Sequence, residues 1–167
     1  MLKRFFERKQ DEDGFTLIEL MVVVLIIGIL IAIALPTFLG ARTRAQNSAA
    51  QSDLRNALVA AKTIYTDNSS YQCAQAITGV AAPCVGNTGL PGVEPSLTYV
   101  VGAATGTSVG VMAAPSATDW SASRLSASGF CFYISDTSAV GTKYGQAAAS
   151  GACAAPTVAL ANNASWS

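Results

Sequence analysis

The most unusual chemical group in this 167-residue chain is the carboxylic acid of Glu19, which stands beside a long apolar run. From Leu20 to Leu35 no charged or strongly polar side chain interrupts the sequence. An ionisable group in such a segment costs about 3 kcal/mol on membrane-insertion scales and usually marks function. Glu19 therefore needs a cationic partner, unless it is protonated or reaches lipid head groups by snorkelling.

Four cysteines are the second set of reactive residues, and all follow residue 70: Cys73, Cys84, Cys131 and Cys153. An even number in what we expect to be an exported region indicates two disulfides, although four cysteines allow three connectivities. Pairing Cys73 with Cys84 and Cys131 with Cys153 is favoured because each bridge then closes a local loop. The spacing does not match a zinc site with closely paired ligands, and the chain has no histidine.

The other ionisable residues give little support to catalysis. No acid–base pair, nucleophile with its base or metal cluster is visible, so we expect neither enzyme activity nor a cofactor. The 10 basic and 10 acidic residues balance, and no basic face indicates specific nucleic-acid binding. A membrane-tethered extracellular enzyme or receptor remains as an alternative class.

The apolar segment that carries Glu19 is long enough to cross a membrane once. Residues 15–35, as a helix rising ~1.5 Å per residue, span roughly the 30 Å of a bilayer's hydrocarbon core. Basic residues before the segment predict a cytoplasmic N-terminus and an exported C-terminal part: Lys3, Arg4, Arg8 and Lys9. A cleaved secretory signal with a site at Ala32-Ile33-Ala34 would have a shorter apolar run, and a plain anchor leaves Glu19 unexplained.

The rest of the chain predicts a half-buried helix followed by β-structure. Apolar residues recur at helical spacing after Pro36, at Leu54, Leu58, Ala61 and Tyr65. The turn-forming residues 67–70 then end the pattern, so we expect one kinked helix over 15–66. Short β-branched or aromatic stretches predict an antiparallel sheet packed on this helix, over 97–101, 107–112, 120–126 and 130–135. The fold class is therefore α+β.

Residues 13–36, DGFTLIELMVVVLIIGILIAIALP, closely resemble the N-terminal signature of class III type IV prepilins. In that family a prepilin peptidase cuts after the last leader residue, a glycine, and the new N-terminal phenylalanine is methylated. The resemblance makes Gly14 the last leader residue, Phe15 the first mature residue and Glu19 the family's glutamate at the fifth mature position. Gly28 and Pro36 also fall on family positions, although acidic residues directly before Gly14 depart from the net basic leader of many members.

The resemblance continues through FLGARTRAQ and SDLRNAL, which are similar to actinobacterial-type pilins, and covers about the first 70 residues. It implies the pilin fold, with a kinked helix packed on a small β-sheet head. The implied parts are a leader (1–14), a transmembrane and filament-core helix (15–36), an amphipathic helix (37–68) and a globular β-rich head (69–167).

Cleavage before Phe15 would create an α-ammonium group four residues from Glu19, and both charges would lie among apolar side chains. A close ion pair within one helix is awkward, but an axially shifted neighbour can bring its amine to this carboxylate. Glu19 then specifies register and recruits subunits. Gly28 and Pro36 weaken helix and predict a flexible joint, although such residues are also ordinary packing features of transmembrane bundles.

The resemblance implies a structural subunit of a type IV pilus used for adhesion, twitching motility or DNA capture. The implied partners are other copies of the chain in a helical homopolymer, prepilin peptidase, the assembly platform with its motor ATPases, and minor pilins. We expect a single-pass membrane protein before assembly and an extracellular pilus afterwards. The alternative is a pseudopilin of a type II secretion or competence system.

Overall fold

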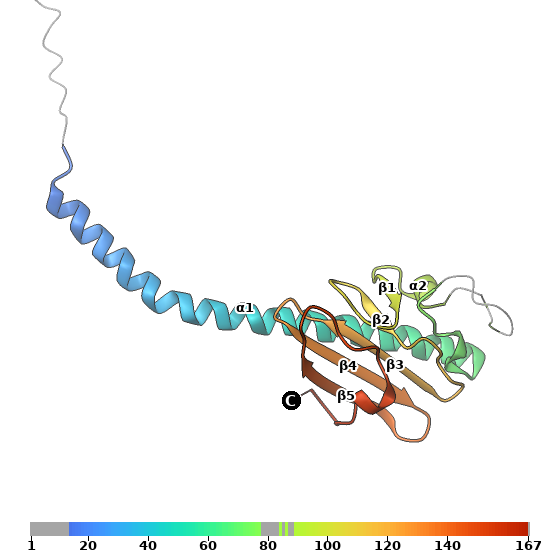
Figure 1. Cartoon of the computed structure of the whole chain (residues 1–167). Helices are drawn as coiled ribbons and strands as arrows, with labels where there is room; N and C mark the ends of the chain where they lie inside the picture. The colour runs from blue at the N-terminus through green and yellow to red at the C-terminus, as the bar shows by residue number, and fades with distance from the viewer. Residues whose placement is uncertain (1–13, 78–83, 85, 87–88, 167) are drawn as a thin grey trace, which may run out of the picture. The chain divides into compact units, whose positions relative to one another are not determined.

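The computed structural model describes residues 14–77, 84, 86 and 89–166. The chain divides into two compact units, Met1–Ala41 and Arg42–Ser167, and each is described by itself. The described elements are α1 (Leu17–Asn68), the 3₁₀ turn η1 (Tyr71–Cys73), α2 (Gly89–Val93), β1 (Tyr99–Val101), β2 (Val109–Val111), β3 (Asp119–Leu125), β4 (Phe130–Thr137), β5 (Gly141–Ala148) and the 3₁₀ turn η2 (Val158–Leu160) (Figure 1).

Helix α1 runs for 52 residues and ends close to the predicted position. Ser69, the first residue after the helix, has a left-handed φ of 53°, and its N–H donates to the carbonyl of Tyr65 at 2.7 Å. The side-chain amide of Asn68 donates to the carbonyl of Ile64 at 2.9 Å. These bonds satisfy carbonyls that the last helical turn would otherwise leave unpaired.

The second unit contains a five-stranded sheet in the order β1-β2-β3-β4-β5. Strands β2 to β5 form an antiparallel meander. The predicted antiparallel sheet is confirmed, except at one edge, where β1 and β2 are parallel, with Tyr99 opposite Val109. Between them the chain folds back over Gly110, where a Cβ atom would lie 2.3 Å from the carbonyl oxygen of Gly102. Glycine at position 110 therefore permits the close approach that this short parallel connection requires.

The main core lies between α1 and one face of the sheet. The helix contributes a stripe of small and aliphatic side chains, and the sheet contributes alternate residues of its strands. The fully buried members with large side chains include Leu54, Val109, Val111, Trp120, Phe132 and Ile134. The indole N–H of Trp120 donates to the carbonyl of Ala74 at 3.1 Å, which satisfies its one buried polar group.

The C-terminal segment covers the other face of the sheet and then reaches its β5 edge. Cys153 and Ala161 pack with Tyr133 on this second face. Asn163 pairs with Tyr144 of β5 through two backbone hydrogen bonds of 2.8 and 2.9 Å. Trp166 then packs against the main core, with its ring centroid 4.5 Å from that of Tyr144. The chain end is thus tied to both faces of the sheet.

Candidate functional site

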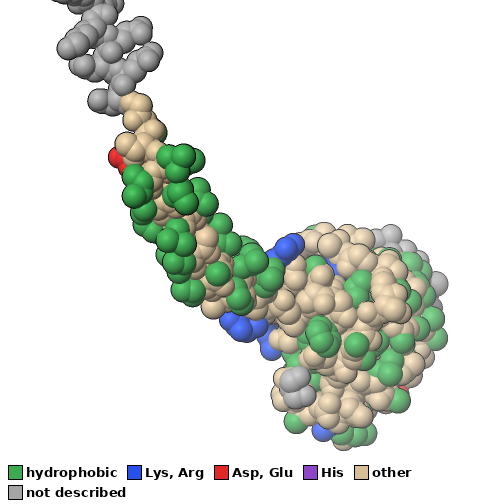
Figure 2. Space-filling model, turned by 60° about the vertical axis from the view of Figure 1, so that its left-hand side comes forward, with side chains coloured by type: hydrophobic (Ala, Val, Ile, Leu, Met, Phe, Trp, Pro, Cys, Tyr) green, Lys and Arg blue, Asp and Glu red, His purple; other side chains and the backbone are tan. Residues whose placement is uncertain are grey.

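The first unit presents an apolar helical surface. Within residues 15–39 every Leu, Ile, Val, Met and Phe side chain is exposed, and Phe15 is exposed to 83 %. Figure 2 shows hydrophobic side chains over the visible face of this segment. Exposed apolar area of this extent marks a membrane or protein interaction surface.

Helix α1 is the one described helix that is long and apolar enough to cross a membrane, judged by length and composition alone. Its most apolar 18-residue stretch has a mean hydropathy of 3.1, and none of that stretch is buried in the chain's own fold. A helix buried in a soluble core would pass the same test of composition but would not be exposed. The surface therefore requires lipid or other protein as its surroundings.

Glu19 and Thr16 form a reciprocal capping box at the start of α1. The backbone N–H of Thr16 and its hydroxyl donate to Glu19 Oε2 at 2.9 and 2.7 Å, while the N–H of Glu19 donates to Thr16 Oγ1 at 3.2 Å. A Thr-x-x-Glu pattern satisfies N–H groups that the first helical turn leaves without partners. Because both Thr16 bonds go to Oε2, the second oxygen Oε1 accepts no hydrogen bond from the described residues.

Gly28 and Pro36 lie within α1, which the structure assigns as continuous helix through both residues (Figure 1). A Cβ atom added at Gly28 would meet nothing within 4 Å. In the turn that contains Pro36, the Thr37 hydroxyl donates to the carbonyl of Ala34 at 2.9 Å. Such a bond competes for a helical carbonyl near the proline that lacks an N–H. The flexible joint stays a prediction.

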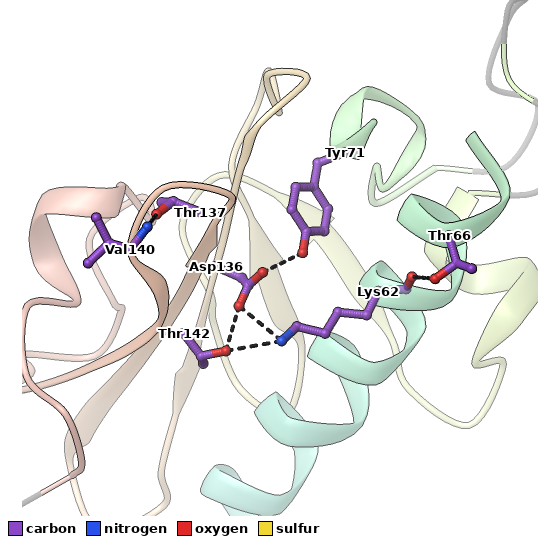
Figure 3. Close-up of polar contacts among 7 residues, drawn as sticks. All are labelled: Lys62, Thr66, Tyr71, Asp136, Thr137, Val140 and Thr142. Atoms are coloured by element: carbon purple, nitrogen blue, oxygen red, sulfur yellow. Dashed lines mark hydrogen bonds and ion pairs between the residues drawn. The ribbon is translucent and has the colours of Figure 1, made fainter. Parts of the chain in front are cut away.

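In the head, Asp136 of β4 is the centre of a polar cluster that joins α1 to the sheet (Figure 3). Lys62 Nζ lies 3.1 Å from Asp136 Oδ1 and donates to Thr142 Oγ1 at 3.2 Å. The hydroxyls of Tyr71 and Thr142 each donate to the carboxylate at 2.5 Å. Asp136 is buried, exposed to only 6 %, so these donors replace the water that the charge has lost.

The same contacts set the proton affinities in this cluster. Burial alone would raise the pKa of Asp136, but hydrogen bonds from Thr142, Tyr71 and Lys62, with the charge of Lys62, lower that pKa below its ordinary value. Burial, followed by the bond to Asp136, raises the pKa of the Tyr71 hydroxyl. The aspartate is therefore ionised and the tyrosine neutral across the physiological range, which is the protonation that the observed bonds require.

A second buried charge, Arg124 of β3, joins the sheet to an earlier part of α1. Its Nε donates to Asp53 Oδ2 at 2.9 Å, and its Nη1 donates to the carbonyls of Gly106 and Leu125 at 2.7 and 2.8 Å. A planar guanidinium held by a carboxylate and two carbonyls is fixed in direction. These contacts position the helix on the head and do not form a catalytic arrangement.

The structure links Cys73 to Cys84 and Cys131 to Cys153. The first bridge joins Cys73 of η1 to Cys84, which precedes α2. The second joins Cys131 of β4 to Cys153 in the C-terminal segment, on the face of the sheet opposite the main core. The head residues thus stabilise one compact unit, while Phe15, Glu19, Gly28 and Pro36 all belong to the other unit. Sequence reasoning missed Thr16, although the Thr-x-x-Glu spacing was a signal that could have found it.

Comparison with known proteins gives one family model and several relatives, each of which matches part of the chain. The family model described as the prokaryotic N-terminal methylation motif matches residues 9–35. The type IV major pilin protein PilA of Myxococcus xanthus is 47 % identical over 58 residues, which cover 35 % of this chain and 26 % of that protein. The type IV wide pilus major component PilA4 of Thermus thermophilus is 40 % identical over 67 residues, or 40 % of this chain and 51 % of that protein.

A secretion component matches over a similar share. The type II secretion system core protein G of Klebsiella michiganensis is 42 % identical over 65 residues, covering 38 % of this chain and 45 % of that protein. The chain therefore spans between a quarter and about half of the length of these relatives. No solved structure matches.

The N-terminal methylation motif matches residues 9–35, which include much of the exposed apolar helix, and the similar proteins include type IV pilins and a type II secretion core protein. The second unit is an α+β fold with a mostly antiparallel sheet. The chain therefore carries the N-terminal methylation motif and is similar, over part of its length, to type IV pilins and to a type II secretion core protein.

Proposed function

We propose that this chain is the structural subunit of a type IV pilus, and that it polymerises through its N-terminal helix. The observation that carries the proposal is the apolar surface of residues 15–39, which the chain's own fold leaves exposed. Once the helix leaves the lipid, exposing this surface to water would cost about 25 cal/mol per Å² of apolar area, and packing against identical helices avoids that cost. The subunit role is structural, with no reaction assigned to the head.

Processing prepares the helix for assembly. The motif match over residues 9–35 supports cleavage by a prepilin peptidase between Gly14 and Phe15, followed by methylation of the new amine. Gly14 lies outside α1, which begins at Leu17, so the scissile bond is in an exposed segment without regular secondary structure, which a peptidase can reach. Before cleavage the helix holds the chain in the membrane with the head outside, and after assembly the subunit lies in a surface pilus.

The hydrogen bonding of Glu19 supports a charge pair between subunits. Its Oε2 is occupied by Thr16 of the same chain, which leaves Oε1 to receive the α-ammonium of a neighbour's Phe15. A buried cation without this partner would cost several kcal/mol. The pairing sets adjacent subunits four residues out of register, because Phe15 of one copy then lies level with Glu19 of the next. Assembly also requires a platform, motor ATPases and minor pilins.

The second candidate is a pseudopilin of a type II secretion or competence system, which would use the same assembly chemistry in a short filament. The similarity to a type II secretion core protein G favours this candidate. The two disulfides of the head fit both candidates, because such bridges persist outside the cell and in the periplasm. The similarity to two type IV pilus proteins favours the pilus. We therefore rank the pilus first.

Two measurements on the expressing cells test the proposal. Fibres sheared from the cell surface should contain this chain, and mass spectrometry of those fibres should find Phe15, methylated, at the N-terminus. Intact Met1 or an N-terminus at Leu35 in assembled fibres would contradict the processing. Long surface fibres in electron micrographs support the pilus, whereas the chain confined to the cell envelope in a secretion-competent strain supports the pseudopilin.

A further inference from the structure

A cleft of about 440 Å³ opens in the second unit, between the outer face of the sheet and the C-terminal segment that covers it. Its floor carries polar strand residues, among them Asp119, Thr137 and Lys143. Its sides include apolar residues of the β4–β5 turn and of η2. The cleft lies on the face of the sheet opposite the main core, so the packing of α1 on the head does not account for it.

The strand register places the polar side chains of the floor on the same face. Ser135 of β4 lies opposite Lys143 of β5, and its hydroxyl donates to the carbonyl of Ala161 in the C-terminal segment at 3.4 Å. Cross-strand partners project from one face of a sheet, so the side chain of Lys143 lies on the covered face as well. Asp119 is paired with Thr137, two residues along β4 from Ser135, and the period of two puts both on this face.

Three polar groups of the floor have hydrogen-bonding capacity that the described residues do not use. The half-buried Lys143 forms no ion pair or hydrogen bond with any of these residues. The Thr137 hydroxyl oxygen accepts from the N–H of Val140 at 3.1 Å (Figure 3), but its hydrogen is donated to none of them. Hydrogen bonds to the Asp119 carboxylate go to Oδ2, which leaves Oδ1 as an acceptor. A cation, a donor and an acceptor therefore line one cleft.

These groups define the chemical class of ligand that fits. A single ammonium balances one negative charge, which suits a carboxylate better than a doubly charged phosphate, and the nearby Asp119 opposes any further negative charge. The acceptor of Asp119 and the donor of Thr137 both suit ligand hydroxyls. The side chains of Val140 and Val158 offer an apolar surface to the C–H groups of a ring. The volume lies within the range of about 300–1,000 Å³ that is usual for small-molecule sites.

We propose that this cleft binds a sugar acid. The sugar carboxylate pairs with the ammonium of Lys143, and ring hydroxyls bond to Asp119 Oδ1 and the Thr137 hydroxyl. The inference goes beyond the proposed function and does not depend on filament formation, because the cleft is made by the second unit alone. A free sugar acid and the terminal sugar acid of a surface glycan present the same carboxylate and hydroxyls to these residues.

An NMR titration of the isotope-labelled full chain in detergent tests the site, with glucuronate as the probe. Glucuronate should shift the backbone amide signals of Thr137, Lys143 and Asn162, with a dissociation constant on the order of 1 mM for so open a site. Methyl glucoside, which keeps the ring but lacks the carboxylate, and acetate, which lacks the ring, should each bind at least about tenfold more weakly. Equal binding of either compound, or signal shifts confined to residues outside the cleft, overturns the proposal.

Two variants test the cleft in independent ways. Lys143→Gln removes the cation and should weaken glucuronate binding about tenfold. Ala139→Phe keeps the cation but adds a ring at an exposed wall position, and should reduce binding by filling the cleft. Arg44→Gln is the matched control, because it removes a positive charge from an exposed α1 position outside the cleft and should bind as the wild type does. Unchanged binding by Lys143→Gln, or equal losses in Arg44→Gln and Lys143→Gln, overturns the site.

Methyl glucuronide distinguishes the two sources of the sugar acid. Its anomeric oxygen is blocked, as it is in the terminal residue of a glycan. Binding equal to that of free glucuronate supports the end of a glycan as the ligand, and weaker binding supports the free acid. Failure of both compounds to bind the wild-type chain overturns the proposal and leaves the pilus proposal intact, since no fibre is needed for this measurement.

Discussion

Glu19 accepts two hydrogen bonds from Thr16 through a single oxygen, Oε2. The carboxylate therefore has a role in its own helix before any neighbour arrives, because it completes the capping box at the start of α1. Its other oxygen, Oε1, accepts no hydrogen bond from a described residue and is the atom proposed to meet a neighbour's amine. Variants that separate charge from hydrogen bonding can tell the two roles apart.

Glu19→Gln keeps an oxygen that accepts from Thr16 but removes the negative charge. We expect it to block fibre formation as completely as Glu19→Ala, because an incoming α-ammonium would be buried unpaired at a cost of several kcal/mol. Immunoblots of sheared fibres and membranes measure the outcome, with each variant as the sole subunit. Cleavage at Gly14 and membrane insertion should be intact, since removal of the acid makes the segment more apolar.

Thr16→Val is the matched variant, because it removes the hydroxyl of the cap and leaves the charge of Glu19. Losing a capping side chain costs about 1 kcal/mol of helix stability, so fibres should still form at a modestly reduced yield. Normal fibre yield from Glu19→Gln would refute the charge pairing. Complete loss of fibres in Thr16→Val would assign the function of Glu19 to capping.

The Asp136 cluster predicts a specific response of the head to acid. The folded-state pKa of Asp136 lies below its ordinary value of 3.8. Ionised Asp136 therefore stabilises the fold at pH values above 3.8, and this contribution to the free energy of unfolding is lost as pH falls through the folded-state pKa. Asp136→Asn should lower the free energy of unfolding by about 2 kcal/mol at neutral pH, because charged hydrogen bonds to Tyr71 and Thr142 are weakened.

The test is thermal unfolding of the full chain in detergent between pH 7 and pH 2. The wild-type melting temperature should fall more steeply below pH 4 than that of Asp136→Asn, and the two curves should converge in acid. Asp119→Asn serves as control, since Asp119 is a β3 residue outside the cluster. Parallel curves for the wild type and Asp136→Asn would show that Asp136 carries no favourable charge interaction.

The disulfides predict unequal losses of stability. The Cys131–Cys153 bridge closes a sequence separation of 22 residues and the Cys73–Cys84 bridge one of 11. In the chain-entropy model each contributes about 3 kcal/mol, with the longer loop contributing somewhat more. Non-reducing peptide maps of exported protein should recover both links, and the double variant Cys131→Ser/Cys153→Ser should unfold earlier than Cys73→Ser/Cys84→Ser. Free thiols in exported protein would contradict the pairing.

Gly110→Ala should disrupt the parallel edge of the sheet. The new Cβ would lie 2.3 Å from the carbonyl oxygen of Gly102 and 2.7 Å from the amide nitrogen of Ala104, and backbone atoms cannot yield as a flexible side chain does. We expect a loss of several kcal/mol, on the scale of severe overpacking. Ser123→Ala is the control, because its buried hydroxyl has no hydrogen-bond partner among the described residues and its loss should be nearly neutral. Equal melting temperatures for Gly110→Ala and the wild type would mean that the loop can move away.

The helix and most strands were predictable because their signals are local. The periodic residues Leu54, Leu58 and Ala61 are buried in the core, and the turn-forming run at 67–70 coincides with the end of α1. Strand β5 was missed because Gly141–Ala148 is rich in glycine and alanine and has little intrinsic strand preference. Its pairing with β4 over eight residues supplies what the sequence lacks.

The residues of the candidate sites also differ in whether their local sequence indicates them. The sequence isolated Glu19 because a charge in an apolar run is a one-dimensional signal. The polar contacts that join α1 to the sheet have no such local signal. Lys62 and Asp136 are 74 residues apart, and neither local sequence indicates the other residue. Local sequence also does not indicate the parallel pairing of β1 with β2. That pairing depends on the close approach of the loop after Gly102 to Gly110.

The pairing of Asn163 with Tyr144 also affects how crowded copies behave. Strand β5 is an edge of the sheet, and an uncovered edge is a template on which the strand of another molecule can add. In a fibre, heads are held at very high local concentration, where such growth would produce irreversible aggregation. Asn163 occupies backbone groups in the middle of that edge, and Trp166 anchors the covering segment to Phe132 and Tyr144. The segment around Asn163 thus leaves less of the β5 edge open to another molecule, and in the proposed fibre this would leave the apolar helix as the surface through which copies join.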